Sequence, residues 1–265
     1  MSPNISVAFL TYNRSKTAIK SISSVANDPN VRDIVIFDDC SKENEINIIK
    51  DSCKSLKNIT IRINKKNLGF RDNLIQALKY LSTKNTDFVF LCESDMLLSK
   101  GWGNSVNEAF KASTNSVALS VMLHKDQMIK NRSEIFKTRS LTGKDPRYPH
   151  ITGKKPFGDL CYIEMPNEQE YIKLKRHEIK YVSNSIGSLI FKKDALKIIC
   201  SETNKLHFHY EDEDAWLSYM CFKINKYNAK SLMVLDPGIA FTFGEPGLHG
   251  YMFLNNLRWD GSFMW

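Results

Sequence analysis

Acidic side chains gather at three places where a polar cluster follows an apolar segment. Two carboxylates separated by one small residue are suited to hold a hard divalent cation together with phosphate oxygens. Carboxylates at such positions also face solvent in loops or cap helices, so no single cluster decides a function. The three clusters are Asp38-Asp39, Glu93-Ser94-Asp95 and Glu211-Asp212-Glu213-Asp214.

The elements that must position the first two clusters alternate between strand and helix patterns. Helices with apolar residues at spacings of three and four are expected after each of the first three strands. The expected inward positions are Ile46, Ile49 and Cys53 in the second helix and Leu74, Leu78 and Leu81 in the third. Such alternation with short connections predicts an α/β fold with a central, mostly parallel sheet flanked by helices and right-handed crossovers. Strands are expected at residues 5–10, 33–37, 59–63 and 88–92.

Each of these strands ends in a polar cluster. Because the carboxyl ends of parallel strands meet at one edge of a sheet, the clusters are expected to converge there, where open α/β sheets bind ligands. This convergence favours a binding site more strongly than any one cluster does. Further along the chain, a helix is expected at 102–112, a strand at 117–122, a strand at 186–191 and a helix at 215–222.

The segment 124–182 differs from its surroundings, because it mixes Gly, Pro, aromatic and basic residues without periodicity. Residues 124–197 hold 16 Lys or Arg against 9 Asp or Glu, a surplus of +7 within a chain of net charge +8. We interpret 124–182 as a long functional insertion or lid, with a disordered linker as the alternative. The expected organisation is one domain with two halves, 1–123 and 124–265, of which the second ends in a Gly- and aromatic-rich tail.

Composition sets bounds on the class of protein. With 265 residues, 42% hydrophobic and 25% charged, the chain is typical of a globular protein with a substantial core. Apolar runs are shorter than the roughly 18 residues of a membrane span, and the N-terminus lacks a signal-peptide pattern, so a cytoplasmic location is expected. The six cysteines form no C-x-x-C pair, which argues against a zinc cluster or a disulfide framework.

The order and spacing of six short motifs resemble those of the family-2 glycosyltransferases of the GT-A fold, across roughly residues 5–236. The resemblance implies a single Rossmann-like domain and a metal-dependent transferase that uses a nucleotide sugar, with UDP as the expected nucleotide. It also implies that the half 1–123 binds the nucleotide sugar and that the half 124–265 faces the acceptor. The motifs are Phe9-Leu10-Thr11-Tyr12-Asn13-Arg14, Ile36-Phe37-Asp38-Asp39-Cys40-Ser41, Asn67-Leu68-Gly69-Phe70, Glu93-Ser94-Asp95, Gly187-Ser188-Leu189-Ile190 and Glu211-Asp212.

The resemblance also implies roles for the residues that would contact the donor. Asp38 or Asp39 would accept a hydrogen bond from the uracil N–H, a donor that a carboxylate reads specifically. The plain alternative for this pair is a strand-to-helix cap. Residues implied near the base, ribose or diphosphate are Thr11, Asn13, Arg14, Asn67, Gly69, Arg71, Glu93 and Ser94, with a solvated first-turn arginine as the alternative for Arg71.

Glu93-Ser94-Asp95 matches the D-x-D metal motif of the family, with Glu in place of the first Asp. The resemblance implies that Asp95 binds Mn²⁺ or Mg²⁺ bridging the donor diphosphate, which is Lewis-acid catalysis. Glu93 would ligate the metal directly, act through water or lie nearer the ribose. His249 is a candidate late metal ligand, with an ordinary loop histidine as the alternative.

Glu211-Asp212 matches the E-D pair of the family, which implies that Asp212 is the general base of an inverting single displacement, with Glu211 as second choice. Asp214 is interpreted as a cap or ion-pair member. The acceptor would be a sugar hydroxyl on a glycan, glycoprotein or lipid-linked saccharide. The sequence leaves the oligomeric state open.

Two other functional classes compete with this interpretation. A nucleotidyltransferase also joins an α/β sheet to metal-binding carboxylates, but it usually has a Gly- and basic-rich loop after the first strand, and residues 11–14 lack that richness. A basic nucleic-acid-binding module is suggested by the Lys, Arg and aromatic residues of 124–182. No RNA- or DNA-binding signature occurs, so no nucleic-acid partner is expected.

Overall fold

The computed structural model describes residues 3–94, 96–121, 178–181, 188–203, 213–236 and 240–242. The chain divides into two compact units, and every described residue belongs to the first, which comprises residues 1–123 and 169–242. The second unit, residues 124–168 and 243–265, lies outside the described residues. The C-terminal tail and most of the expected insertion therefore stay predictions.

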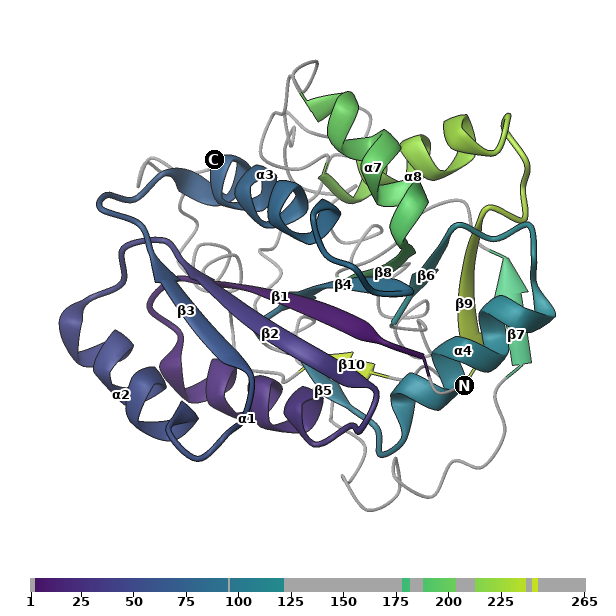
Figure 1. Ribbon diagram of the computed structural model, residues 1–265. Helices are drawn as coiled ribbons and strands as arrows, with labels where there is room; N and C mark the ends of the chain where they lie inside the picture. Colours follow the sequence, from purple (N-terminus) through teal and green to yellow (C-terminus); the bar gives the residue numbers. More distant parts are fainter. Residues whose placement is uncertain are drawn as a thin grey trace, which may run out of the picture. The chain divides into compact units, whose positions relative to one another are not determined.

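An eight-stranded sheet forms the centre of the described unit, in the order β3-β2-β1-β4-β8-β6-β9-β7 (Figure 1). Strands β3, β2, β1 and β4 pair in parallel, as do β6 and β9, whereas β8 is antiparallel to both β4 and β6, and β7 is antiparallel to β9. The strands are β1 (Ile5–Thr11), β2 (Val31–Asp38), β3 (Ile59–Ile63), β4 (Phe88–Glu93), β6 (Ala118–Ser120), β7 (Glu178–Tyr181), β8 (Leu189–Lys192) and β9 (Leu232–Asp236).

Helices cover both faces of this sheet, with α1 and α2 on one face and α3, α7 and α8 on the other (Figure 1). The predicted α/β class with a mostly parallel, helix-flanked sheet is confirmed. The apolar positions that the sequence assigns to the third helix, Leu74, Leu78 and Leu81, are all fully buried. The helices are α1 (Ser15–Ala26), α2 (Glu43–Cys53), α3 (Gly69–Ser82), α4 (Trp102–Ala112), α7 (Lys193–Ser201) and α8 (Glu213–Ile224).

Strand β4 is buried on both faces, as its unbroken apolar run predicts. Val89 and Leu91 pack into the core cluster that α3, α7 and α8 cover. On the other face, the Phe90 ring lies 5.4 Å from the Trp102 ring of α4, and the Phe88 ring stacks on Phe110 at 4.8 Å. Because packing holds β4 from both sides, the residues that follow it leave the sheet at a fixed point.

Several elements differ from the sequence-based expectation. The strand expected at 117–122 is described only over Ala118–Ser120, and β7 occupies the end of a segment that we expected to be an irregular insertion. Strand β9 was not expected either. A small second sheet pairs β5 (Met96–Leu98) with β10 (Ala240–Thr242) in antiparallel fashion, and neither strand was expected. These short strands are defined by pairing with distant segments, which local periodicity does not report.

Gly103 offers a stability test of the fold. A Cβ at Gly103 would come within 2.7 Å of Asp28 Oδ1 and 2.9 Å of Asn30 Nδ2. Asp28 is buried, and its Oδ2 accepts the Gly103 N–H at the start of α4. We expect Gly103→Ala to lower the free energy of unfolding in urea by about 2 kcal/mol through overpacking. Gly101→Asn is the control, because that position is left-handed but open, so a near-equal loss there would contradict the crowding argument.

Candidate functional site

The register of three neighbouring strands brings the predicted polar residues to one edge of the sheet. Strand β1 pairs with β2 so that Thr11 lies opposite Asp38, and it pairs with β4 so that Leu10 lies opposite Glu93. All three strands run in the same direction. The polar ends of β1, β2 and β4 therefore converge at their carboxyl edge.

The loops that follow β1 and β2 are tied together by hydrogen bonds. The backbone N–H of Asn13 donates to Ser41 Oγ at 2.8 Å, and Asn13 Oδ1 accepts the Lys42 N–H at 2.9 Å. Asn13 and Cys40 both adopt left-handed backbone angles, with φ of 52° and 66°. Asparagine tolerates this region better than most residues, whereas a thiol side chain gains nothing there, so tertiary contacts hold Cys40 in place.

Asp38 and Asp39 occupy different environments. Asp38 has no exposed surface, and its two carboxylate oxygens accept hydrogen bonds from the backbone N–H and the hydroxyl of Ser41. It closes the turn after β2 but does not cap α2, because the N-cap residue of that helix is Lys42, which has no side-chain cap hydrogen bond. Asp39 retains 4% of its surface, and its carboxylate binds the turn that leads into α3.

The turn into α3 wraps around the Asp39 carboxylate. Oδ1 accepts the Leu68 N–H at 2.8 Å and Oδ2 accepts the Gly69 N–H at 2.9 Å. Asn67 Oδ1 also accepts the Gly69 N–H, at 2.9 Å. Gly69 has a φ of +80°, a conformation that a side chain would strain, which explains glycine at this position. The Asn67–Phe70 turn is therefore built to surround a carboxylate.

The acidic turn after β4 is anchored through the backbone of Glu93. Its N–H donates to Ser188 Oγ at 2.7 Å, and its carbonyl accepts from Ser21 Oγ at 3.3 Å. Ser94 is buried, with 3% of its surface exposed, and Glu93 is half-buried. Side chains from α1 and from the residue before β8 thus hold the point at which Glu93 and Ser94 leave the sheet.

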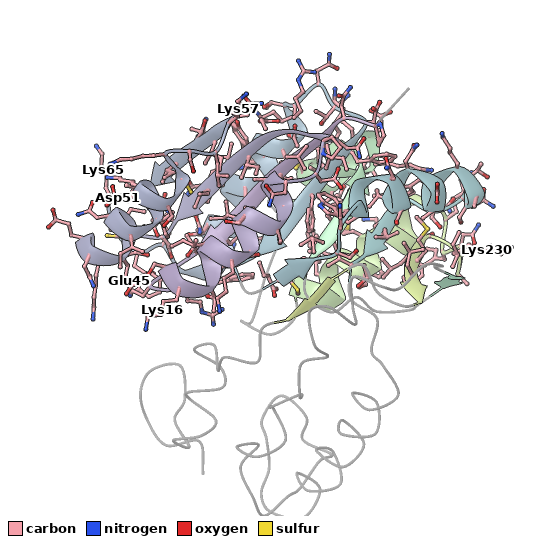
Figure 2. The ribbon with its side chains drawn as sticks, turned by 90° about the horizontal axis from the view of Figure 1, so that it is seen from below. Lys16, Glu45, Asp51, Lys57, Lys65 and Lys230 are labelled. Carbon is pink, nitrogen blue, oxygen red and sulfur yellow. The ribbon has the colours of Figure 1, made fainter. Side chains whose placement is uncertain are left out.

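The start of α1 lies directly after the first-strand loop and is capped from α2. Glu45 Oε2 accepts the Ser15 N–H at 2.9 Å, next to the Arg14 N-cap position. Hydrogen bonding from Ser15, with the charges of Lys16 and Lys42, holds the pKa of the Glu45 carboxyl below its ordinary value. Glu45 and Lys16 project at the same end of these helices (Figure 2). The cap keeps the loop of Asn13 and Arg14 against the second-strand loop.

Arg71 lies in the first turn of α3, where its side chain is 46% exposed and its Nε lies 3.8 Å from Asp72 Oδ1. A partly solvated side chain of this kind is free to reorient toward a ligand, but an exposed ion pair contributes little stability. Arg71 directly follows the Asn67–Phe70 turn that surrounds Asp39. Its contact with a nucleotide stays a prediction.

Four predicted residues lie outside the described residues: Asp95, Glu211, Asp212 and His249. Within the described part of the chain, no group of three His, Cys, Asp or Glu side chains is arranged to hold a metal ion. Asp95 directly follows the anchored Ser94, and Asp212 directly precedes α8. Their predicted roles as metal ligand and general base stay predictions, as do those of Glu211 and His249.

A hollow of about 610 Å³ lies at the other end of β4, lined among others by Phe88, Phe110 and Lys192. Desolvation lowers the pKa of the Lys192 ammonium there, whose Nζ donates to the Thr114 carbonyl at 2.9 Å. None of the predicted site residues that the structure describes lines this hollow. The carboxyl edge of the sheet is therefore the candidate site.

The model of the family described as "Glycosyl transferase family 2" matches residues 6–184, which is more than half of the chain. The chain belongs to glycosyl transferase family 2. The match covers β1 through β7 and therefore includes the three strand ends that form the candidate site. No curated protein sequence matches the family-2 chain.

Solved structures of related fold support the architecture of this family-2 chain. S. aureus TarS 1-349 in complex with UDP-GlcNAc is 18% identical with a TM-score of 0.54, covering 94% of this chain and 60% of that one. A mannosyltransferase from Pyrobaculum calidifontis in complex with GDP-Man and Mn²⁺ is 14% identical with a TM-score of 0.50, covering 84% and 52%. The family-2 chain thus spans about three fifths and about half of these two chains, and the likeness shows the GT-A fold alone.

Sequence reasoning missed two residues of the family-2 site, Asn64 and Asn73. Asn64 follows β3, so the same strand-end argument that selected Asp39 would have found it. Asn73 lies on the buried stripe of α3 beside Leu74, and an amide on an apolar stripe is a signal that it has a specific partner. Both residues hydrogen-bond within the Asp39 turn.

The described part of the family-2 chain contains no helix long and apolar enough to cross a membrane.

Proposed function

We propose that the protein transfers a sugar from a UDP-sugar to a hydroxyl of a glycan or glycoconjugate, by an inverting single displacement that requires Mn²⁺ or Mg²⁺. The observation that carries the proposal is the shared edge of β1, β2 and β4, where the register brings Thr11 and Glu93 to the strand ends and Asp39, directly after β2, donates its N–H to the Thr11 carbonyl. The two solved structures bound to UDP-GlcNAc and to GDP-Man with Mn²⁺ support a nucleotide-sugar donor for this fold.

Asp39 is the residue that we propose contacts the base. Of the two neighbouring carboxylates, Asp38 is fully enclosed and engaged by Ser41, whereas Asp39 retains exposed surface at the sheet edge. A carboxylate that accepts an imide N–H forms a charge-assisted hydrogen bond. The loop of Asn13 and Arg14 and the Asn67–Gly69 turn flank Asp39 and would enclose the nucleotide, with Arg71 close to its phosphates.

The acidic turn after β4 supplies the oxygen ligands that a hard cation prefers. Asp95 would hold Mn²⁺ or Mg²⁺, assisted by Glu93, by the Ser94 region and by His249 from the C-terminal segment. Such a cation offsets the negative charge that develops on the departing diphosphate. The serines that anchor the Glu93 backbone would keep this turn in place when the ligand binds.

Asp212 is the proposed general base, with Glu211 as its neighbour in the same cluster. It precedes α8, whose inner face is fixed by the buried side chains of Leu217, Met220 and Cys221. A base must lie within hydrogen-bond reach of the acceptor hydroxyl, so a position at the start of an anchored helix suits the role. The segment 124–182 would bind the acceptor.

A nucleotide-sugar screen tests this function. The purified chain is incubated with UDP-GlcNAc, UDP-Glc, UDP-Gal and GDP-Man, each with Mn²⁺ or with EDTA, and released nucleoside diphosphate and the melting temperature are measured. We expect a UDP-sugar to raise the melting temperature in Mn²⁺ and to release UDP slowly by hydrolysis. Pyrophosphate formation from a sugar phosphate and a nucleoside triphosphate would instead identify a nucleotidyltransferase, and binding of RNA alone would contradict both.

A further inference from the structure

Most of the hydrogen-bond acceptor positions of the Asp39 carboxylate are already occupied by donors of the protein itself. Among the described residues, three donors reach it: Asn64 Nδ2 at 2.9 Å and Leu68 N at 2.8 Å on Oδ1, and Gly69 N at 2.9 Å on Oδ2. An ionised carboxylate has about four lone-pair positions, two on each oxygen. Oδ1 is therefore full, and Oδ2 has room for one more hydrogen bond.

Chemistry fixes which end of Asn64 faces Asp39. Asn73 Nδ2 lies 3.1 Å from the Phe37 carbonyl, and because a carbonyl only accepts, this atom must be the Asn73 NH₂ group. Asn73 Oδ1 then faces Asn64, whose Nδ2 lies 3.1 Å away. The Asn64 NH₂ group has two hydrogens, and it donates one to Asn73 and one to Asp39.

The hydrogen-bonded pair of Asn64 and Asn73 is held in place on both sides. Asn73 is 3% exposed on the inner face of α3, and the Asn64 backbone N–H donates to the Asp38 carbonyl at 2.9 Å. Turning the Asn64 amide over would put its carbonyl oxygen against two acceptor oxygens, on Asp39 and Asn73. That arrangement loses two hydrogen bonds in a half-buried place, so the observed orientation dominates.

We propose that Asn64, oriented by Asn73, is a specificity-determining residue that limits Asp39 to one ligand N–H and thereby selects a uracil-type base over guanine. The proposal rests on the function proposed above. Uracil and thymine carry one N–H on their pairing edge, which Oδ2 can accept. Guanine presents two adjacent donors, N1–H and the 2-amino group, that a carboxylate would read with both oxygens, and Oδ1 has no position left for the second.

The number of free acceptor positions on Asp39 also predicts how tightly cytosine and guanine nucleotides bind. Cytosine presents a ring acceptor where uracil presents its donor, so it would place a lone pair against Oδ2. Guanine would leave one desolvated N–H without a partner, which lowers affinity by about 10- to 100-fold. The predicted order of affinity is UDP and dTDP above GDP and CDP.

The order is tested by titrating UDP, dTDP, CDP and GDP into the full chain with Mn²⁺, by calorimetry. We expect UDP to bind about 10- to 100-fold more tightly than GDP. In Asn64→Ala, Oδ1 regains one acceptor position, so the UDP-to-GDP ratio is expected to fall by about tenfold, while CDP stays weak. Alanine is chosen because it removes the donor and leaves the freed position of Oδ1 open to the guanine 2-amino group.

Asn107→Ala on α4 is the matched control, because it makes the same change at a half-buried asparagine that lines the hollow at the other end of β4. It is expected to keep the wild-type ratio. A merely structural role of Asn64 would weaken all four nucleotides together and leave the ratio unchanged, which would overturn the proposal.

The wild-type series decides the matter even if Asn64→Ala does not fold. Equal or tighter binding of GDP by the unaltered chain would refute the selection while leaving sugar transfer intact. Binding of none of the four nucleotides in Mn²⁺ would remove the proposed function and the selection with it. The two failures are therefore distinguishable.

Discussion

Asp212→Asn is expected to lower the rate of sugar transfer by about 10²- to 10⁴-fold, the usual contribution of a general base. Asparagine has the shape of aspartate but takes up no proton at neutral pH, so the acceptor hydroxyl would have to attack without losing its proton. Transfer is measured as glycosylated acceptor formed, and UDP-sugar binding by calorimetry is expected to be unchanged.

The fold should tolerate Asp212→Asn because α8 is held by its inner face. Leu217, Met220 and Cys221 are each at most 2% exposed, and burial of such side chains outweighs one charge before the first turn. The control is Asp194→Asn, which makes the same substitution in the first turn of α7, where the side chain is 91% exposed. Wild-type turnover by Asp212→Asn would assign the base elsewhere, with Glu211 as the next candidate.

Asp95→Asn is expected to abolish the response to Mn²⁺ and to lower transfer by about 10³-fold, because a Lewis acid at the diphosphate supplies several kcal/mol. The amide oxygen is a poorer ligand for a hard cation than a carboxylate. Two measurements separate metal loss from other damage: turnover, and the ratio of UDP affinities with Mn²⁺ and with EDTA. In the variant that ratio is expected to approach one.

The turn around Asp95 should keep its shape in this variant. Glu93 is fixed through its backbone by Ser188 and Ser21, and β5 resumes at Met96 in a pairing with β10. Asp87→Asn tests the same change at the opposite end of β4, where the carboxylate accepts the Asn4 N–H. That control should keep its Mn²⁺ response, and a preserved response in Asp95→Asn would show that Asp95 does not bind the metal.

Local patterns in the sequence predicted the framework of the site well. The apolar spacing of Ile46, Ile49 and Cys53 predicted the inner face of α2, and the structure buries all three. The two-sided apolar run of β4 predicted a central strand, and the strand lies between β1 and β8. The sequence predicts these features because the buried positions of a helix or strand that packs against its neighbours recur at the period of that element.

The sequence predicted a strand at 186–191, where β8 lies, but local patterns did not predict its antiparallel direction or the short pairings. Strand β8 inserts between β4 and β6, and β5 pairs with β10, although the partners lie far apart in the chain. Three-residue strands carry too little alternation to be recognised alone, and their register depends on the partner strand. The expectation of an irregular segment up to residue 182 was wrong over Glu178–Tyr181 for the same reason.

The sequence by itself determined which residue types end each strand, and therefore that carboxylates, hydroxyls and amides gather at one edge of a parallel sheet. Only the tertiary structure decided which of these side chains is enclosed, which stays exposed and which hydrogen bonds each one makes. It encloses Asp38 and leaves Asp39 at the edge, and it joins Asn64 and Asn73 to the Asp39 carboxylate. The reason is physical: the alternation of strands and helices follows from local pattern, whereas the exposure and hydrogen-bond capacity of one carboxylate depend on groups that long-range folding brings to it.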